Sequence, residues 1–293
     1  MFGLIGIIGV IVLVYAAWQR SELKKFRVTR YEMESKKIKK ELTFAVISDL
    51  HSFSYGVDNE RLVQAVLAER PDLVLVPGDL IVTAVTNKYA VALALIRRLC
   101  DAGIPVVCSN GNHESRAGLL DFADRAVFLQ YCRQLNEAGA VFLNNECRIQ
   151  KIRGETVRIC GLELPLYSYK KGRKPYLEEG FLTSCLGSAS DQHLQILLAH
   201  HPAFADRYAA WGADLTVCGH NHGGLVCIPG IGSVVSPQFL PFPEYDAGEF
   251  TIDGRKVFIS RGLGTHTFHI RVFNRAELLV IKAKPAREPD RQP

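Results

Sequence analysis

Polar residues of the kinds that bind metal ions follow five apolar segments of this 293-residue chain. They form the motifs Asp49-Leu50-His51, Gly78-Asp79, Gly111-Asn112-His113-Glu114, His200-His201-Pro202 and Gly219-His220-Asn221-His222. Any one of these motifs alone is typical of a surface turn or a helix cap. Six of the nine histidines nevertheless fall within them. Chance is therefore a poor explanation, and the five motifs together indicate one binding site.

The donor groups in these motifs decide which ions they suit. The motifs supply carboxylate, amide and imidazole groups without a thiolate, a set that suits Mn²⁺, Fe²⁺ or Zn²⁺ rather than Ca²⁺ or an iron–sulfur cluster. Two Asp, one Asn and several His are too many ligands for one tetrahedral Zn²⁺. The set therefore predicts two divalent metal ions that share one carboxylate, an arrangement that binds phosphate and activates water.

The segments that must position these motifs alternate between apolar runs and helix-like stretches in the first half of the chain. The predicted strands are residues 43–48, 73–77 and 104–109, and the predicted helices are residues 59–69, 88–100 and 119–138. This order predicts an α/β domain with parallel strand pairing. In an open sheet of this kind the site lies outside the carboxyl ends of the strands, which is where the motifs fall.

The second half of the chain is predicted to be richer in strands. Its short apolar runs, bounded by Gly and Pro, are residues 157–161, 195–200, 215–218, 232–235, 257–260 and 277–283. Residues 167–179 are polar, basic and contain Pro, so they predict a loop. Neither a repeat nor a boundary interrupts residues 43–284, which we predict to form one catalytic domain. Residues 285–293 are predicted to be a disordered tail.

Residues 1–19 are predicted to form a transmembrane anchor. Residues 2–18 carry no charge, and this run is at the short end for a membrane span. Tyr15 and Trp18 lie where an interfacial aromatic belt is expected. A secretory signal peptide is disfavoured because a positive amino-terminal region and a small-residue cleavage site are lacking. A buried core helix is the remaining alternative.

Residues 20–42 are predicted to be a basic linker. Between Arg20 and Lys40 there are nine Lys and Arg against three acidic residues. Basic residues beside a span tend to stay cytoplasmic, which predicts a single-pass membrane protein with a cytoplasmic catalytic domain. The linker would then lie against anionic lipid headgroups. The net charge is only +5, and the catalytic region lacks a basic and aromatic stripe, so nucleic acid is not an expected partner.

The eight cysteines show no Cys-x-x-Cys pair. Several lie inside apolar runs, where a free Cys behaves as a small hydrophobic residue. We therefore predict buried thiols in a reducing compartment, although an even number of cysteines also permits disulfides.

The order Asp-x-His, Gly-Asp, Gly-Asn-His-Glu, His-x-Pro and Gly-His-x-His resembles the five sequence blocks of the calcineurin-like metallophosphoesterases. The resemblance covers residues 43–283, and the wording of several blocks is similar to that of a bacterial membrane-anchored branch. It implies a four-layer sandwich of two mixed β-sheets flanked by α-helices, preceded here by the transmembrane helix.

The resemblance also implies a role for each motif residue. One metal ion would be held by Asp49, His51 and His222, the other by Asn112, His200 and His220, and both by Asp79. His113 would not be a ligand, but would donate a proton to the leaving oxygen or stabilise charge there.

For several other polar residues the sequence gives weaker indications of a role. Glu114 is expected to orient its loop or His113, with capping of the following helix as the alternative. His201 is the less favoured of the adjacent histidine pair. Arg261 is a possible phosphate contact. We expect His193, His266 and His269 to be structural or solvated.

We therefore predict that the protein is a metal-dependent hydrolase of a phosphodiester or pyrophosphate bond. A phosphomonoester substrate is also compatible with the motifs. The predicted anchor and linker favour a membrane-associated or lipid-linked substrate. The alternative is a soluble nucleotide or cyclic nucleotide. A non-catalytic metal-binding scaffold is disfavoured, because such a protein is expected to have lost ligands or the proton donor, and here the set is complete.

Overall fold

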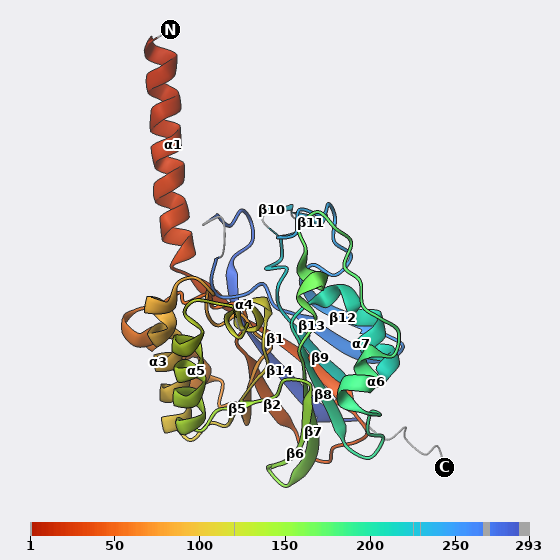
Figure 1. Ribbon diagram of the computed structural model, residues 1–293. Helices are drawn as coiled ribbons and strands as arrows, with labels where there is room; N and C mark the ends of the chain where they lie inside the picture. Colours follow the sequence, from red (N-terminus) through yellow and green to blue (C-terminus); the bar gives the residue numbers. More distant parts are fainter. Residues whose placement is uncertain (1, 120, 225, 229, 266–269, 287–293) are drawn as a thin grey trace, which may run out of the picture.

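Two six-stranded β-sheets pack face to face, and helices cover their outer faces (Figure 1). The computed structural model describes the chain except for residues 1, 120, 225, 229, 266–269 and 287–293. The helices are α1 (Phe2–Leu23), α2 (Glu60–Ala68), α3 (Tyr89–Asp101), α4 (Asn112–Ala117), α5 (Arg125–Glu137), α6 (Phe181–Leu186) and α7 (Ala205–Trp211). The strands are β1 (Phe26–Ser35), β2 (Leu42–Val46), β3 (Leu73–Val76), β4 (Val106–Cys108), β5 (Val141–Phe142), β6 (Glu146–Ile152), β7 (Glu155–Leu162), β8 (Leu194–Ala199), β9 (Leu215–Cys218), β10 (Val226–Ile228), β11 (Gly232–Val235), β12 (Gly248–Ile252), β13 (Arg255–Ile259) and β14 (Ala276–Pro285).

Both large sheets are mixed. The first has the order β1-β14-β2-β3-β4-β5, in which β2 to β5 are parallel and β14 runs antiparallel to β2. The second has the order β12-β13-β9-β8-β7-β6, with a parallel centre and an antiparallel strand at each edge. Strands β10 and β11 form a separate hairpin. The predicted α/β sandwich of two mixed sheets flanked by helices is confirmed.

The core follows the alternation of side chains along each strand. Phe44 and Val46 of β2 lie in the apolar cluster between the two sheets, together with Ile196 of β8. Ala45, between them in sequence, lies in the cluster under α2, α3 and α5. A third cluster joins the outer face of the second sheet to α6 and α7. Because successive strand residues point to opposite faces, one apolar run fills two layers of the core.

The central strands of both sheets lie where the sequence predicted them. The helix boundaries and the edge strands differ from the prediction. The predicted helix over residues 119–138 begins only at Arg125, as α5, and a separate short helix, α4, precedes it. Strand β6 at the edge of the second sheet was not predicted. Its residues alternate between exposed and half-buried, so it has no apolar run to reveal it. Of the predicted tail, Pro285 ends β14, and residues 287–293 lie outside the described part of the chain.

The basic linker predicted over residues 20–42 is wrong for its middle part, because β1 occupies residues 26–35. This strand pairs with β14 at the edge of the first sheet, and its Met33 is buried between the sheets. The charges that suggested a linker have partners in the domain: Arg30 pairs with Glu69, and Lys37 Nζ lies 2.8 Å from Asp214 Oδ2. An edge strand carries many charges because only one of its faces is well covered.

Helix α1 extends away from the sandwich (Figure 1). Its carboxyl-terminal end is tied to the domain, since Gln19 Nε2 donates to the carbonyl of Arg271 (3.1 Å) and Glu22 pairs with Arg275. Among the helices of the described residues, none has the length and apolar character that a membrane span requires. The predicted transmembrane anchor is thus not supported.

Two of the eight cysteines form a disulfide, Cys147–Cys160. They face each other in the register of β6 and β7, with Cα atoms 4.0 Å apart. The prediction that the cysteines are thiols is therefore wrong for this pair, because it ignored cross-strand pairing. Cys108, Cys218 and Cys227 are buried and free, as predicted.

Replacing Met33 by Ala tests whether β1 is part of the sandwich. The change leaves a cavity between the sheets and should lower the free energy of unfolding by about 2–3 kcal/mol, the usual cost of truncating a buried Met. Urea denaturation followed by circular dichroism measures this loss. Glu34→Ala on the exposed face of the same strand is the control, expected within about 0.5 kcal/mol of the wild type. Equal stability of the two variants would contradict the placement of β1.

Candidate metal centre

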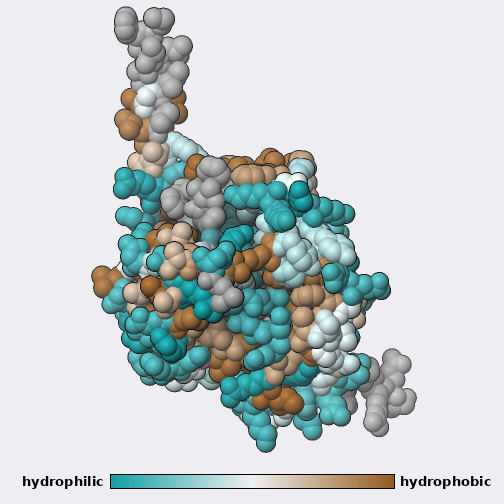
Figure 2. Space-filling view, in the orientation of Figure 1, coloured by the Kyte–Doolittle hydropathy of each residue, from teal (hydrophilic) through white to brown (hydrophobic). Residues whose placement is uncertain are grey.

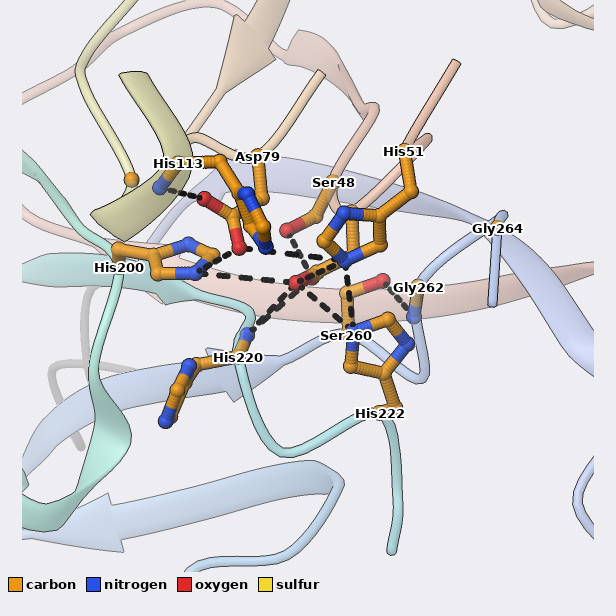
Figure 3. Close-up of polar contacts among 12 residues, drawn as sticks. Ser48, His51, Asp79, His113, His200, His220, His222, Ser260, Gly262 and Gly264 are labelled. Atoms are coloured by element: carbon orange, nitrogen blue, oxygen red, sulfur yellow. Dashed lines mark hydrogen bonds and ion pairs between the residues drawn. The ribbon is translucent and has the colours of Figure 1, made fainter. Parts of the chain in front are cut away.

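The five motifs meet at the carboxyl ends of strands from both sheets. Asp49, Asp79 and Asn112 follow β2, β3 and β4 of the first sheet. His200 and His220 follow β8 and β9 of the second. Figure 3 shows the side chains of His51, Asp79, His200 and His222 lying close together at this place. The predicted juxtaposition is therefore correct, and it requires two sheets rather than one open sheet edge.

The turns that carry these residues have an unusual backbone. Five of the seven predicted ligands have positive φ angles: Asp49 (50°), His51 (48°), Asp79 (55°), His220 (65°) and His222 (51°). Residues other than glycine rarely adopt this left-handed conformation, and it costs about 1–3 kcal/mol each. The fold thus keeps strained turns in order to aim side chains at one point.

A first group consists of Asp49, His51 and His222, whose ligand atoms all lie within 4.8 Å of one another. His51 Nε2 is 3.0 Å from His222 Nε2, and His222 Nε2 is 3.2 Å from Asp49 Oδ1. Ser48 Oγ donates to the other carboxylate oxygen of Asp49 at 2.6 Å. The hydroxyl thereby fixes the carboxylate and leaves Oδ1 directed at the two imidazoles.

A second group consists of Asp79, His200 and His220, again within 4.8 Å. His200 Nε2 is 3.1 Å from Asp79 Oδ2, and His200 Nδ1 lies 3.1 Å from the carbonyl oxygen of Pro77. A carbonyl accepts only from a protonated nitrogen, so Nδ1 carries a proton and orients Nε2 toward the carboxylates. One arm of the Asn112 amide reaches His220 Nδ1 at 3.1 Å, so Asn112 joins this group.

Asp79 lies between the two groups. Its Oδ2 is 3.1 Å from His200 Nε2 and 3.9 Å from His51 Nε2, while its Oδ1 accepts the backbone N–H of His113 at 2.9 Å. Asp49 Oδ1 is placed in a similar way, 3.2 Å from His222 Nε2 and 3.7 Å from His200 Nε2. Both carboxylates therefore face both groups, and either position suits a shared ligand.

The donor atoms and their charges fit divalent cations. Within the described residues, the buried Nε2 atom of His220 makes no hydrogen bond. Burial would raise the pKa of the Asp49 carboxyl, but His222, His200 and His51 hold it below its usual range. Burial lowers the pKa of His51 and His220 well below the ordinary value. Burial would also lower the pKa of His200, but Asp79 and Asp49 raise it to about 9. Ionised carboxylates and neutral imidazoles are the states that bind metal, so a cation would have to displace one proton from His200.

His113 lies beside both groups but is held differently. The backbone N–H of Thr83 donates to His113 Nδ1 at 3.0 Å, and Thr83 Oγ lies 2.9 Å from the same atom. Because Nδ1 accepts, the proton of the neutral ring is on Nε2. The ring also forms a cluster with His51 and Asp79. This hydrogen bond therefore places a proton donor next to the candidate ligands.

Glu114 joins the loop after β3 to the loop after β4. Its buried carboxylate accepts four backbone N–H groups: those of Asp79, Leu80, Ile81 and Gly111, at 2.8–3.2 Å. The expectation that Glu114 orients its loop agrees with these contacts.

The other predicted polar residues lie apart from the three candidate clusters. His201 Nε2 bonds Gln238 Oε1 at 2.7 Å, and Arg261 bonds Asn274 at 3.0 Å. His266 and His269 lie outside the described residues. The pocket over the site is also lined by Arg116, Tyr169, Lys171 and Gln238, which sequence reasoning missed. Arg116 had one available signal, since it is one helical turn beyond Asn112.

Residues 42–224 match the family described as calcineurin-like phosphoesterase. The chain belongs to this family. It is therefore a hydrolase that acts on phosphoester bonds, and the clusters of buried His and Asp are consistent with the dinuclear metal site typical of the family.

Similar proteins include the metallophosphoesterase YkuE of Bacillus subtilis, which is 25% identical over 241 residues, 81% of this chain and 77% of YkuE. The phosphodiesterase YaeI of Escherichia coli is 23% identical over 242 residues, 80% of each chain. Among solved structures, the phosphopantetheinyl hydrolase PptH of Mycobacterium tuberculosis has a TM-score of 0.45 at 17% identity, covering 76% of this chain and 89% of PptH.

Replacing Glu114 by Gln tests how strongly this carboxylate organises the two loops. The amide offers one acceptor oxygen in place of two, so buried N–H groups lose their partners, at about 1–3 kcal/mol each. We expect the free energy of unfolding to fall by about 2–4 kcal/mol in urea denaturation. Glu137→Gln at the exposed end of α5 is the control. A loss of less than about 0.5 kcal/mol in Glu114→Gln would contradict the role.

Proposed function

We propose that this chain uses two divalent metal ions, of Mn²⁺, Fe²⁺ or Zn²⁺ type, to hydrolyse a phosphodiester or pyrophosphate bond. Asp49, His51 and His222 hold one ion, and Asn112, His200 and His220 the other. The position of Asp79 Oδ2 between the two histidine groups carries the proposal. When bound, such a metal pair polarises the phosphate and activates water for in-line attack.

His113 serves as the proton donor in this proposal. Its Nδ1 is occupied by the N–H of Thr83, so Nε2 is the nitrogen that gives up a proton to the leaving oxygen. Burial holds the pKa of His113 below its usual value, although Asp79 opposes the shift. The lowered pKa favours the neutral ring, in which Nε2 bears the only ring proton and donates it as a hydrogen bond toward the leaving oxygen.

A lipid-linked or otherwise amphiphilic phosphodiester is the substrate class that we propose. Support comes from exposed apolar residues on and after the β10–β11 hairpin, Ile228, Ile231, Phe239 and Phe242, which we call the apolar rim. Ile231 is 67% and Phe242 66% exposed, and Phe239 directly follows the pocket residues Pro237 and Gln238 in the sequence. Figure 2 shows apolar residues gathered over the β10–β11 hairpin. Exposed apolar patches mark binding surfaces. The bond type is supported by YaeI, whose name is phosphodiesterase.

Loss of Asp79 or His113 tests the mechanism with bis(p-nitrophenyl) phosphate. Asp79→Ala should bind fewer than two Mn²⁺ ions per chain by elemental analysis and lose measurable turnover. His113→Gln should keep both ions and lose kcat by about 10²–10⁴-fold, the usual contribution of a positioned acid.

His193→Ala, outside the three candidate clusters, is the control and should retain wild-type turnover. Full turnover in Asp79→Ala, or two ions bound without turnover of any phosphoester by the wild type, would refute the mechanism.

Replacing apolar side chains of the rim by polar ones tests the proposed substrate class. An Ile231→Ser, Phe242→Ser double variant should lower the ratio of kcat/KM for p-nitrophenyl octyl phosphate over p-nitrophenyl methyl phosphate by about tenfold, because each side chain contributes on the order of 1 kcal/mol of apolar contact. Val57→Ser, exposed on another part of the surface, is the control. An unchanged ratio would exclude the rim as an acyl contact.

A further inference from the structure

We propose that Arg116 and Lys171 form a second anion-binding subsite beside the metal centre, which selects substrates bearing a further negative group next to the scissile phosphate. The inference rests on the proposed function and narrows its substrate class. Both residues line the same pocket as His51, Asp79 and His113.

Arg116 reaches the pocket from α4, the helix that begins with Asn112. Its Nη1 lies 3.0 Å from the outer arm of the Asn112 amide, while the inner arm faces His220. The guanidinium is half-buried, and no carboxylate pairs with it among the described residues. A half-buried Arg offers several N–H donors in a planar fork, so this one has donors left for a ligand oxygen.

Lys171 reaches the pocket from the loop after residues 166–169. Its Nζ lies 5.1 Å from the centre of the Phe239 ring, a cation–π distance. The loop that carries Lys171 is hydrogen-bonded to the loop that carries Gln238 and Phe239. Gly172 N–H donates to the carbonyl of Gln238 at 2.8 Å, and Gln238 Nε2 donates to the carbonyl of Ser168 at 3.1 Å. His201 holds the Gln238 amide from below, at 2.7 Å. Lys171 is thus held at the rim without forming an ion pair within the described part of the chain.

The charge at the site explains why two further cations are useful. The proposed metal pair already neutralises the single charge of a phosphodiester. With Arg116 and Lys171 the pocket therefore carries more positive charge than a phosphodiester with a single negative charge requires. A diphosphate, or a diester carrying a carboxylate or a second phosphate, would match them, because an Arg fork binds such groups by charge-assisted hydrogen bonds. The competing role for Arg116 is stabilisation of the scissile phosphate itself.

Two matched substrates separate these roles. p-Nitrophenyl propyl phosphate and p-nitrophenyl 2-carboxyethyl phosphate share a leaving group and a size, and differ by one negative charge. The full-length chain with Mn²⁺ should favour the carboxyethyl ester in kcat/KM. Arg116→Gln and Lys171→Met should each lower that preference about fivefold to tenfold, mainly through KM for the charged ester. Lys174→Met, in the same loop but not lining the pocket, is the control and should keep the wild-type preference.

The outcomes distinguish the subsite from the proposed function. If Arg116→Gln slows both esters equally and leaves the preference unchanged, Arg116 acts on the scissile phosphate and the subsite is refuted. If the wild type shows no preference for the charged ester, the subsite is likewise refuted while the proposed function stands. If the wild type hydrolyses neither ester with any metal, the proposed function fails first.

Discussion

The structure depends on keeping two aspartates ionised in one buried place. Asp49 is fully buried and Asp79 is 2% exposed, and both carboxylates lie within 4 Å of His200 Nε2. Two negative charges buried against the same imidazole repel each other, and each also loses its hydration. Backbone N–H donors offset part of this cost: those of His220 and His113 bond to Asp49 and Asp79, respectively. The cations that the site is built to bind would offset the rest.

The need for backbone N–H donors to Asp49 and Asp79 determines how closely the loops that carry the motifs approach each other. A donor N–H can reach a carboxylate only if the two loops touch, and glycine makes this possible. A Cβ on Gly219 would lie 2.2 Å from Asp49 Oδ2, and one on Gly111 would lie 2.3 Å from Asp79 Oδ1. The glycines in Gly219-His220 and Gly111-Asn112 are thus fixed by close approach to a carboxylate.

These constraints explain which parts of the molecule could be predicted from the sequence. Central strands such as β2 and β8 are buried on both faces, so continuous apolar runs reveal them, and the motifs follow directly. The metal-ligand types were readable because Asp, Asn and His have few other reasons to cluster. Strand β1 was missed because its charged residues have partners far away in the sequence, such as Glu277 of β14 and Glu69 at the end of α2, which no local pattern reveals. The disulfide was missed because register pairs Cys147 with Cys160 only after β6 and β7 have formed.

The adjacent pair His200-His201 shows where the predictable part of the site ends. Successive residues at a strand end point to opposite sides, so only one of two neighbours can face the carboxylates. His200 takes that side, and His201 turns toward Gln238, with which it forms a buried hydrogen bond. The two histidines therefore have different roles: His200 faces the candidate metal site, and His201 holds Gln238, a residue that lines the pocket. The resemblance to the family's His-x-Pro block predicts the first histidine as the ligand. The second acts through a glutamine 37 residues away, and only the folded chain shows that link.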